Sequence, residues 1–470
     1  MTRPDGASTQ ARSRVVLGRW RITDGPSRSL LSNAGSLFGA TVVTSVIGAI
    51  FWAVAARIFP APAVGLAAAA ISAMLLMGQV ATIGLGTVLM GELSQHEGSE
   101  RGLIYSAVTI SAVVGAVLGA VFIAAASWIA PELNALNVPT AVLLFAIGVA
   151  STASGFVLDQ AFIGLLRGGL QLLRNTIASI TKLIVLIVIG GIGFAVLRPD
   201  GTSLLLAWVA GGVASMALIL AVPRSSDRGP ARPLWHVPEG LAGLALRHHL
   251  LNLSILAPGL LLPLLVTAVM SAEADAYFYI AYMIASLGWA VPAALATALY
   301  ASGARDIEAL TIRLRLAFWL CIGAGIALNL FMLVGAGPLL SIFGAPYADR
   351  AGTLLRLLSL GIFPVTINSL YVPIARLERR FLQGTILNVA GMLVVFLFVV
   401  VGARVGGLDG TGVGWLVGFS IGTLPLLPTV FRVAVRRSVE PISGDLFGQL
   451  PGLGGRPDAL DADVGTRSTR

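Results

Sequence analysis

Apolar residues occur along this chain in runs of about twenty, separated by short polar segments. A run of that length can cross the roughly 30 Å hydrocarbon core of a bilayer as one helix. The first run is too long for a signal-peptide core, and the segment before it is too polar, so it is counted as a mature helix. The pattern predicts an all-α polytopic membrane protein with twelve spans, at about 37–57, 64–90, 104–130, 140–166, 175–197, 202–222, 250–271, 276–301, 316–343, 351–375, 382–403 and 409–431.

Composition supports a membrane protein and excludes several soluble classes. The chain is 56% hydrophobic and 11% charged, whereas a soluble protein carries about a quarter charged residues. A single cysteine, Cys321, excludes an internal disulfide and a zinc cluster. Lys182 is the only lysine among 31 basic residues. With abundant Ala and Gly, this arginine bias indicates a high-GC bacterial coding preference rather than a nucleic-acid binder, and the sequence predicts no cofactor.

The basic residues predict the orientation of the chain. If the N-terminus is cytoplasmic, 25 of the 31 basic residues fall in segments on the inside and four in segments on the outside. An excess of basic residues marks the cytoplasmic side of a membrane protein. We therefore expect both termini to be cytoplasmic, with a basic N-tail at 1–36 and a disordered C-tail at 432–470.

Two halves are predicted, joined by a cytoplasmic linker. The linker at 223–249 separates six spans at 37–222 from six at 250–431. Asp-Gly-Thr precedes the last span of each half, starting at Asp200 and at Asp409, and Leu-Gln opens the fifth span of each half. Such parallel repeats are typical of transporters in which two bundles rock about a central site.

Several stretches carry a family resemblance, among them "WAVAARIFPAPAVGLAAA", "ATIGLGTVLMGEL" and "VLDQAFIGLLRGGLQLLRN". Over about residues 33–431 the chain resembles the polysaccharide (Wzx-type) flippases of the multidrug/oligosaccharidyl-lipid/polysaccharide (MOP) exporter superfamily. The resemblance implies two six-helix bundles, as in the MATE exporters, around a V-shaped, cationic cavity.

The same resemblance implies a function. Such flippases move a polyprenyl-diphosphate-linked oligosaccharide from the cytoplasmic to the outer leaflet of the bacterial plasma membrane. They do so by alternating access, in the synthesis of surface polysaccharides such as lipopolysaccharide. The implied partners are the lipid-linked oligosaccharide and membrane lipids, with glycan-assembly enzymes as further candidates.

Two opposite charges are predicted within the membrane region, Asp159 and Lys182. A lone carboxylate at the centre of a membrane helix costs roughly 2.5–3.5 kcal/mol on insertion scales. The two residues are nearly equidistant from the middle of the expected turn "RGGLQ", whereas Arg167 and Arg174 are expected to reach the interface. We therefore predict an Asp159–Lys182 pair, which is either a structural staple or part of the cavity lining, where Lys182 would meet a phosphate.

Four further residues are candidate substrate contacts, each with a structural alternative. Arg57 lines the cavity mouth or anchors the first helix, and Arg356 lines the cavity or extends to the surface. Gln79 binds a sugar hydroxyl or a neighbouring helix. Tyr282 is a candidate for stacking on a sugar, whereas Tyr277 and Tyr279 are expected in the outer aromatic belt.

No catalytic constellation and no nucleotide-binding motif occurs in the sequence, so an enzyme is not expected. A membrane glycosyltransferase or polymerase would need a larger outer loop than the chain offers. A cation-coupled drug exporter of the same superfamily remains the main alternative, with Asp159 as its acidic residue. A scaffold for a glycan-assembly complex is a third possibility.

Overall fold

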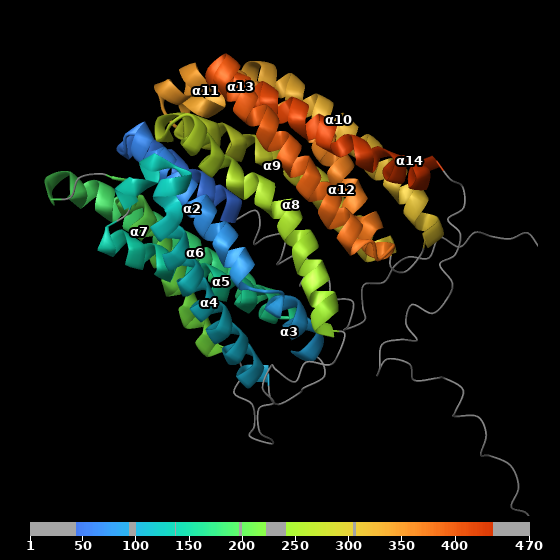
Figure 1. Ribbon diagram of the computed structural model, residues 1–470, viewed down its shortest axis with the longest axis horizontal. Helices are drawn as coiled ribbons and strands as arrows, with labels where there is room; N and C mark the ends of the chain where they lie inside the picture. The colour runs from blue at the N-terminus through green and yellow to red at the C-terminus, as the bar shows by residue number, and fades with distance from the viewer. Residues whose placement is uncertain are drawn as a thin grey trace, which may run out of the picture.

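The computed structural model describes residues 44–93, 100–136, 138–196, 200–221, 241–303 and 307–435, almost all of them helical (Figure 1). Ten helices are long and apolar enough to cross a membrane, and Thr44–Ile58 is a shorter apolar helix. The longest of the ten, Phe381–Arg432, changes direction at Gly406 and Gly407 and crosses twice. The described helices therefore agree with the predicted twelve spans. The N-tail, most of the linker and most of the C-tail lie outside the described residues.

The first half begins with the Thr44–Ile58 helix and continues through α2 (Ala61–Ala81), α3 (Leu85–Leu93), α4 (Glu100–Ile129), η1 (Pro131–Leu136), α5 (Pro139–Gly164), α6 (Gly168–Val196), α7 (Gly201–Ser215) and η2 (Met216–Ala221). The predicted single span 64–90 is interrupted between α2 and α3. Ile83 and Gly84 have φ angles of 46° and 77° there, which an α-helix cannot accommodate.

The second half contains α8 (Leu241–Val269), α9 (Ala272–Gly303), α10 (Ile307–Ser341), α11 (Ala345–Leu360), α12 (Ile362–Leu377), α13 (Phe381–Thr423), η4 (Leu424–Leu426) and α14 (Leu427–Val435). Helix α8 begins nine residues before the predicted span, so the end of the expected linker is helical. Helix α9 begins at Ala272, which places Asp275 inside a helix rather than in the outer loop expected from the sequence.

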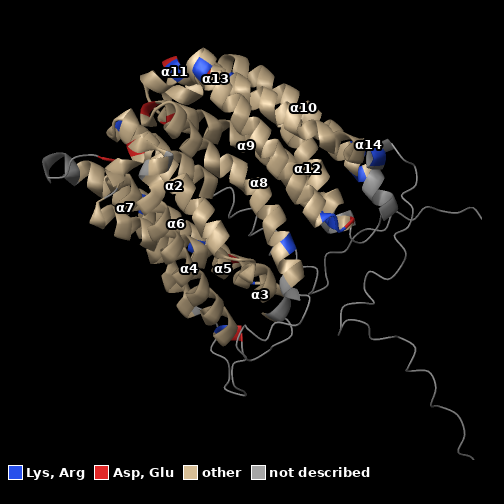
Figure 2. Ribbon diagram, viewed as in Figure 1, with Lys and Arg blue, Asp and Glu red and all other residues tan. Residues whose placement is uncertain are grey.

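Two ends of the molecule are distinguished by their connections. We call the end where α8 begins the linker side, and the end where α8 turns into α9 at Met270 and Ser271 the short-loop side. Charged residues gather near the helix ends, and the lengths of the helices are almost uncharged (Figure 2). This distribution fits helices whose middle portions face hydrocarbon.

The halves meet where α2 packs against α8 and α9. A Cβ at Gly65 of α2 would lie 1.7 Å from the carbonyl oxygen of Ala272, so only glycine allows this approach. Two charged side chains of the first half also bind helix ends of the second. Arg57 donates to the carbonyls of Ser341 and Ile342 at the end of α10, and Glu132 accepts from Ala272 N–H at the start of α9. Each charge complements the helix dipole that it meets, so the halves are joined at the short-loop side.

Glycines bring the two limbs of α13 together. A Cβ at Gly410 would lie 2.1 Å from the carbonyl oxygen of Gly402, and one at Gly414 would lie 2.1 Å from that of Phe398. Gly410 and Gly414 begin a stripe of small residues at intervals of four, the spacing that allows membrane helices to pack closely. Trp415, which follows Gly414, lines the cavity described below.

Candidate functional site

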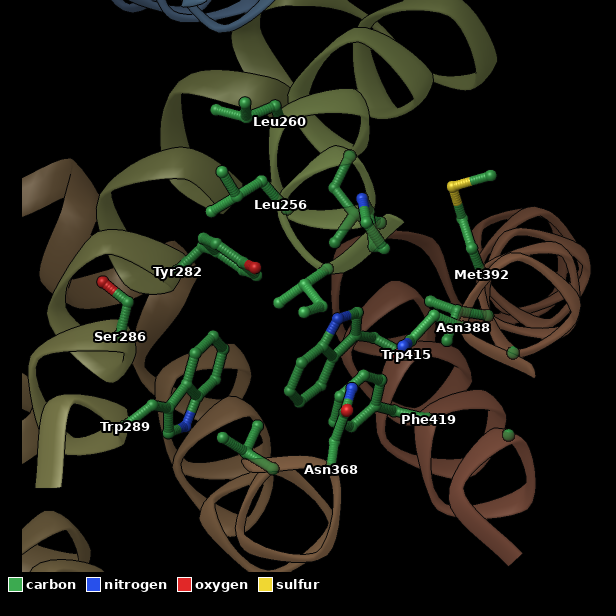
Figure 3. A pocket seen from close by; sticks show the side chains of 18 of the residues that line it. Leu256, Leu260, Tyr282, Ser286, Trp289, Asn368, Asn388, Met392, Trp415 and Phe419 are labelled. Carbon is green, nitrogen blue, oxygen red and sulfur yellow. The ribbon is translucent and has the colours of Figure 1, made fainter. Parts of the chain in front are cut away.

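A cavity of about 600 Å³ lies mainly within the second half (Figure 3). Helices α8, α9, α12 and α13 supply most of its wall, and α2 and α5 of the first half close one side. Its volume lies within the range of roughly 300–1,000 Å³ that is usual for small-molecule sites. The cavity is therefore the candidate binding site.

Helix α9 presents one stripe of side chains to this cavity. Tyr279, Tyr282, Ser286 and Trp289 follow one another at intervals of three and four residues, and all four line the cavity. Residues at these intervals share one face of an α-helix. The side chains of Tyr282, Ser286 and Trp289 are seen along this face in Figure 3.

An aromatic wall joins α9 to the second limb of α13. The rings of Trp289 and Trp415 are stacked, with centroids 5.0 Å apart and planes 10° apart. Phe419 stacks on Trp415 at 5.3 Å, and Tyr282 meets Trp289 edge-on at 5.1 Å. Aromatic rings provide apolar faces on which a planar group or the C–H face of a sugar can lie.

Two polar atoms in the cavity wall are buried without a hydrogen-bond partner among the described residues, Trp289 Nε1 and Asn368 Oδ1. Neighbouring polar groups are already satisfied: Asn388 donates to the carbonyl of Gly384 and Ser286 to that of Met283. Buried polar groups in proteins are nearly always hydrogen-bonded. The wall of the cavity thus contains one unpaired donor and one unpaired acceptor.

No charged residue in the described part of the chain lines this cavity. Its polar atoms belong to hydroxyl, amide and indole groups, so the cationic lining that the flippase resemblance implied is not found here. Of the six residues chosen from the sequence, Gln79 and Tyr282 line the cavity, whereas Arg57, Asp159, Lys182 and Arg356 do not.

The predicted partner of Asp159 was wrong. Its carboxylate accepts two hydrogen bonds from Arg174, from Nε at 2.6 Å and from Nη2 at 2.5 Å, and a third from Asn175 Nδ2 at 3.3 Å. Arg174 also donates to Ser215 Oγ on α7 and is buried instead of reaching the interface as expected. The ion pair joins α5, α6 and α7 within the first half, away from the cavity.

The position of the hairpin turn explains the error. Helix α5 ends at Gly164 and α6 begins at Gly168, so the turn lies several residues before the "RGGLQ" centre assumed from the sequence. Asp159 is therefore five residues from the end of α5 and Arg174 six from the start of α6, at matching depth. Lys182 is fourteen residues from that start and lies far deeper.

Lys182 packs against aromatic rings instead of a carboxylate. Its ammonium nitrogen lies 4.0 Å from the ring centroid of Trp208 and 5.7 Å from that of Phe51. Such cation–π contacts stabilise a desolvated ammonium group. No ion pair of Lys182 is found among the described residues, so the predicted Asp159–Lys182 staple is replaced by two separate arrangements.

The remaining candidates take structural positions. Arg57 Nε donates to Ile342 O at 2.7 Å, which fits the anchoring alternative. Arg356 is exposed and its Nε lies 3.3 Å from the carbonyl oxygen of Leu333 on α10. Tyr279, expected in an outer aromatic belt, is instead part of the cavity wall and packs against Trp52 with centroids 4.7 Å apart.

Sequence reasoning missed the aromatic and amide residues that shape the cavity, Trp289, Asn368, Trp415 and Phe419. A signal for part of this set was present in the three-and-four spacing of polar and aromatic residues along α9. The contribution of α13 had no comparable signal, because it depends on how two distant helices are packed.

Comparisons with known proteins show the fold. No protein-family model and no curated protein matches the sequence. Among solved structures, the chain is similar to "Lipid II flippase MurJ, inward closed conformation", with a TM-score of 0.60 and 14% identity over 85% of this chain and 90% of that one. It is also similar to a MOP-superfamily transporter from Pyrococcus furiosus, with a TM-score of 0.57 and 15% identity over 89% and 98% of the two chains.

A third similarity is to a MATE protein in its straight conformation, with a TM-score of 0.55 and 15% identity over 88% of this chain and 97% of that one. At such identities the similarity concerns the fold alone. The chain is thus an all-α polytopic membrane protein with the fold of the MATE and MurJ transporters, in agreement with the fold class predicted from the sequence.

Proposed function

We propose that the protein is a transporter that moves a lipid-linked oligosaccharide across the bacterial plasma membrane by alternating access. The fold, shared with MATE transporters and the lipid II flippase MurJ, supports a transporter. The flippase resemblance of the sequence supports the choice of substrate class and a role in surface polysaccharide synthesis. In this proposal the glycan-assembly enzymes that make and use the substrate are partners.

One observation favours a sugar in the cavity: a stacked aromatic wall beside free polar groups. Trp289, Trp415 and Phe419 offer apolar ring faces, while Trp289 Nε1 and Asn368 Oδ1 lack partners among the described residues. A sugar has both an apolar C–H face and hydroxyl groups that donate and accept hydrogen bonds. It therefore complements this wall better than a purely apolar ligand, which would leave the buried polar atoms unpaired.

The uncharged lining assigns the cavity to the glycan rather than to the diphosphate. A diphosphate in a cavity without cationic groups would lose hydration without gaining an ion pair, which is costly. We therefore place the diphosphate outside this cavity, towards the linker side. The excess of arginine predicted on that side provides basic residues for it, and it is also the basis for placing both termini in the cytoplasm.

Transport of a labelled substrate tests the proposal directly. The purified full chain is reconstituted into liposomes that contain a fluorescent polyprenyl-diphosphate oligosaccharide, and its movement between leaflets is followed with a reagent that reacts only in the outer leaflet. We expect Trp289→Ala and Asn368→Leu each to lower the flipping rate by about tenfold or more, since each removes about one hydrogen bond or ring contact of 1–2 kcal/mol.

Trp319→Ala is the matched control, because Trp319 is 68% exposed on α10 and does not line the cavity. It should flip the substrate at the wild-type rate. If the wild-type protein leaves the labelled lipid in its original leaflet, or if the cavity variants and Trp319→Ala behave alike, the cavity is not a glycan site and the proposal is wrong.

A cation-coupled exporter of small molecules is the second candidate, favoured by the same aromatic wall. Rings attract organic cations through their negative faces, and MATE proteins are among the similar structures. The same liposomes, loaded with an aromatic cation such as ethidium, distinguish the two. Ethidium efflux that depends on Trp289, together with immobile lipid-linked sugar, would assign the protein to this alternative.

A further inference from the structure

Asp275, at the start of α9, is completely buried, with a relative exposure of 0%. Neither of its carboxylate oxygens has a hydrogen-bond partner among the described residues, and the described part of the chain contains no ion pair to it. A buried carboxylate without a partner is expensive when charged, so the burial of Asp275 calls for a group that neutralises it.

A second buried oxygen lies beside it. Thr267, two residues before the end of α8, is 3% exposed, and its hydroxyl oxygen also lacks a partner. The hydroxyl lies near the Asp275 carboxylate but outside the geometry of a formed hydrogen bond. Asp275 and Thr267 thus lie close together across the α8–α9 turn, and the side chains of both lack hydrogen-bond partners among the described residues.

The position of Asp275 relates it to both the cavity and the contact between the halves. Asp275 precedes Tyr279 by one helical turn and continues the stripe that lines the cavity. Its neighbours Ala272 and Ala276 are the residues on which Gly65 of α2 packs. The carboxylate is therefore buried where the first half closes on the second.

The charged groups that the structure describes near this end of the molecule are engaged elsewhere or exposed. Glu273 pairs with Arg350 at 2.8 Å, Glu132 accepts from Ala272 N–H, and Arg57 donates to the end of α10. Helix α2 carries no charged residue, α10 has its charged residues at the linker side, and the charges of α8 and α12 are also at that side. The others on α11 and α13 are exposed: Asp349, Arg356, Arg404 and Asp409.

We propose that Asp275, with Thr267, is a proton-binding site that couples protonation to closure of the short-loop side. A proton suits the site better than a metal ion, because hard cations take about six oxygen ligands and two side chains supply three oxygens here. The proton makes the carboxyl neutral and allows it to be buried between the halves.

The direction of the coupling follows from the burial. The closed arrangement buries Asp275, so it binds the proton more tightly than an arrangement in which water reaches the carboxylate. Ligands shift a two-state equilibrium towards the state that binds them better. Low pH therefore favours the closed short-loop side, and loss of the proton favours separation of α2 from α9.

A distance measurement across the short-loop side tests this inference without any substrate, so its outcome is independent of the proposed function. The lone Cys321 is replaced by alanine, and spin labels are attached at Val138→Cys in the first half and Val405→Cys in the second, both exposed positions. Their separation is measured in lipid nanodiscs between about pH 5 and pH 9.

The distance should increase with pH in the wild-type background. Asp275→Asn, which is neutral at every pH, should remain at the short distance throughout. Asp349→Asn, the exposed control on α11, should retain the wild-type response. Thr267→Val provides a second variant: it removes a hydroxyl that can donate to the charged form, so the midpoint should move up by about one pH unit.

Three results would overturn the inference. The first is a distance that does not depend on pH in the wild-type background, and the second is an Asp275→Asn variant that responds to pH as the wild type does. A distance that follows sodium, replaced by choline at constant pH, would identify a metal-ion site instead. If Asp275→Asn does not fold, Thr267→Val serves as the test. A pH midpoint of the distance change equal to that of the wild type would then overturn the inference.

Discussion

Two aspartates, one in each half, differ in what surrounds them. Asp159 in α5 accepts three hydrogen bonds, two from Arg174 and one from Asn175. Asp275 in α9 accepts none from the described residues, although it is the more deeply buried of the two. The two aspartates therefore serve different purposes. Asp159 connects helices within one half, and Asp275 is available to bind a proton.

This difference means that Asp159 contributes to the stability of one bundle, whereas Asp275 responds to the arrangement of the two bundles. A satisfied ion pair inside one bundle should remain intact while the bundles move, because its three helices all belong to the first half. An unsatisfied carboxylate between the bundles has a free energy that depends on how they are arranged. Three predictions test the comparison from the first-half side.

The largest effect is expected for Arg174→Met. Removing one partner of a buried pair leaves the other charge uncompensated, which typically costs about 3–5 kcal/mol. The free energy of unfolding in detergent should fall by that amount. The double variant Asp159→Leu/Arg174→Met should recover most of the loss, because neither charge of the pair remains. Losses that simply add in the double variant would show that the two side chains do not act as a pair.

An intermediate effect is expected for Gly155→Ala. A Cβ at Gly155 would lie 2.8 Å from Arg174 Nη1, so the guanidinium has to shift, which strains its hydrogen bonds to Ser215 and Asp159. Overpacking of this kind costs about 1–3 kcal/mol. Gly191→Ala, with no atom within 4 Å of its Cβ, is the control and should be neutral or gain up to about 1 kcal/mol from helix propensity. Equal thermal stability of the two variants would show that a side chain at position 155 does not disturb Arg174.

The smallest effect is expected for Lys182→Met, which keeps the stem and removes the ammonium group. Its contacts with Trp208 and Phe51 are of the cation–π type, and such contacts contribute about 0.5–2 kcal/mol. The effects of Lys182→Met and Asp159→Asn on unfolding should add within about 0.5 kcal/mol in the double variant. A coupling energy larger than this would show that Asp159 and Lys182 interact, as predicted from the sequence.

Sequence reasoning located the buried charge of the first half but assigned it the wrong partner. Hydrophobic runs place spans to within several residues, whereas pairing across a hairpin depends on the position of the turn. Because α6 begins at Gly168 rather than at 175, the depths of all its residues shift by about two turns. Arg174 thereby moves from the expected interface to the level of Asp159.

The second half shows the same limit at a helix start. Asp275 is one residue outside the predicted span and was expected in a loop, yet α9 already begins at Ala272. Its neighbours Ala272 and Ala276 contact Gly65 of α2, which is distant in the sequence. A shift of a few residues at a boundary, combined with packing between the halves, thus changed a loop acid into a buried one.

The sequence by itself determined the class of fold and the number of spans, because the bilayer sets the length of every apolar run. It also located Gln79 and Tyr282, which line the cavity. Only the tertiary structure decided which groups meet: Asp159 with Arg174, Trp289 with Trp415, and Asp275 with no charged partner among the described residues. The physical reason is that periodicity specifies which face of a helix is apolar, whereas the rotation and depth at which helices pack depend on close contacts between distant residues.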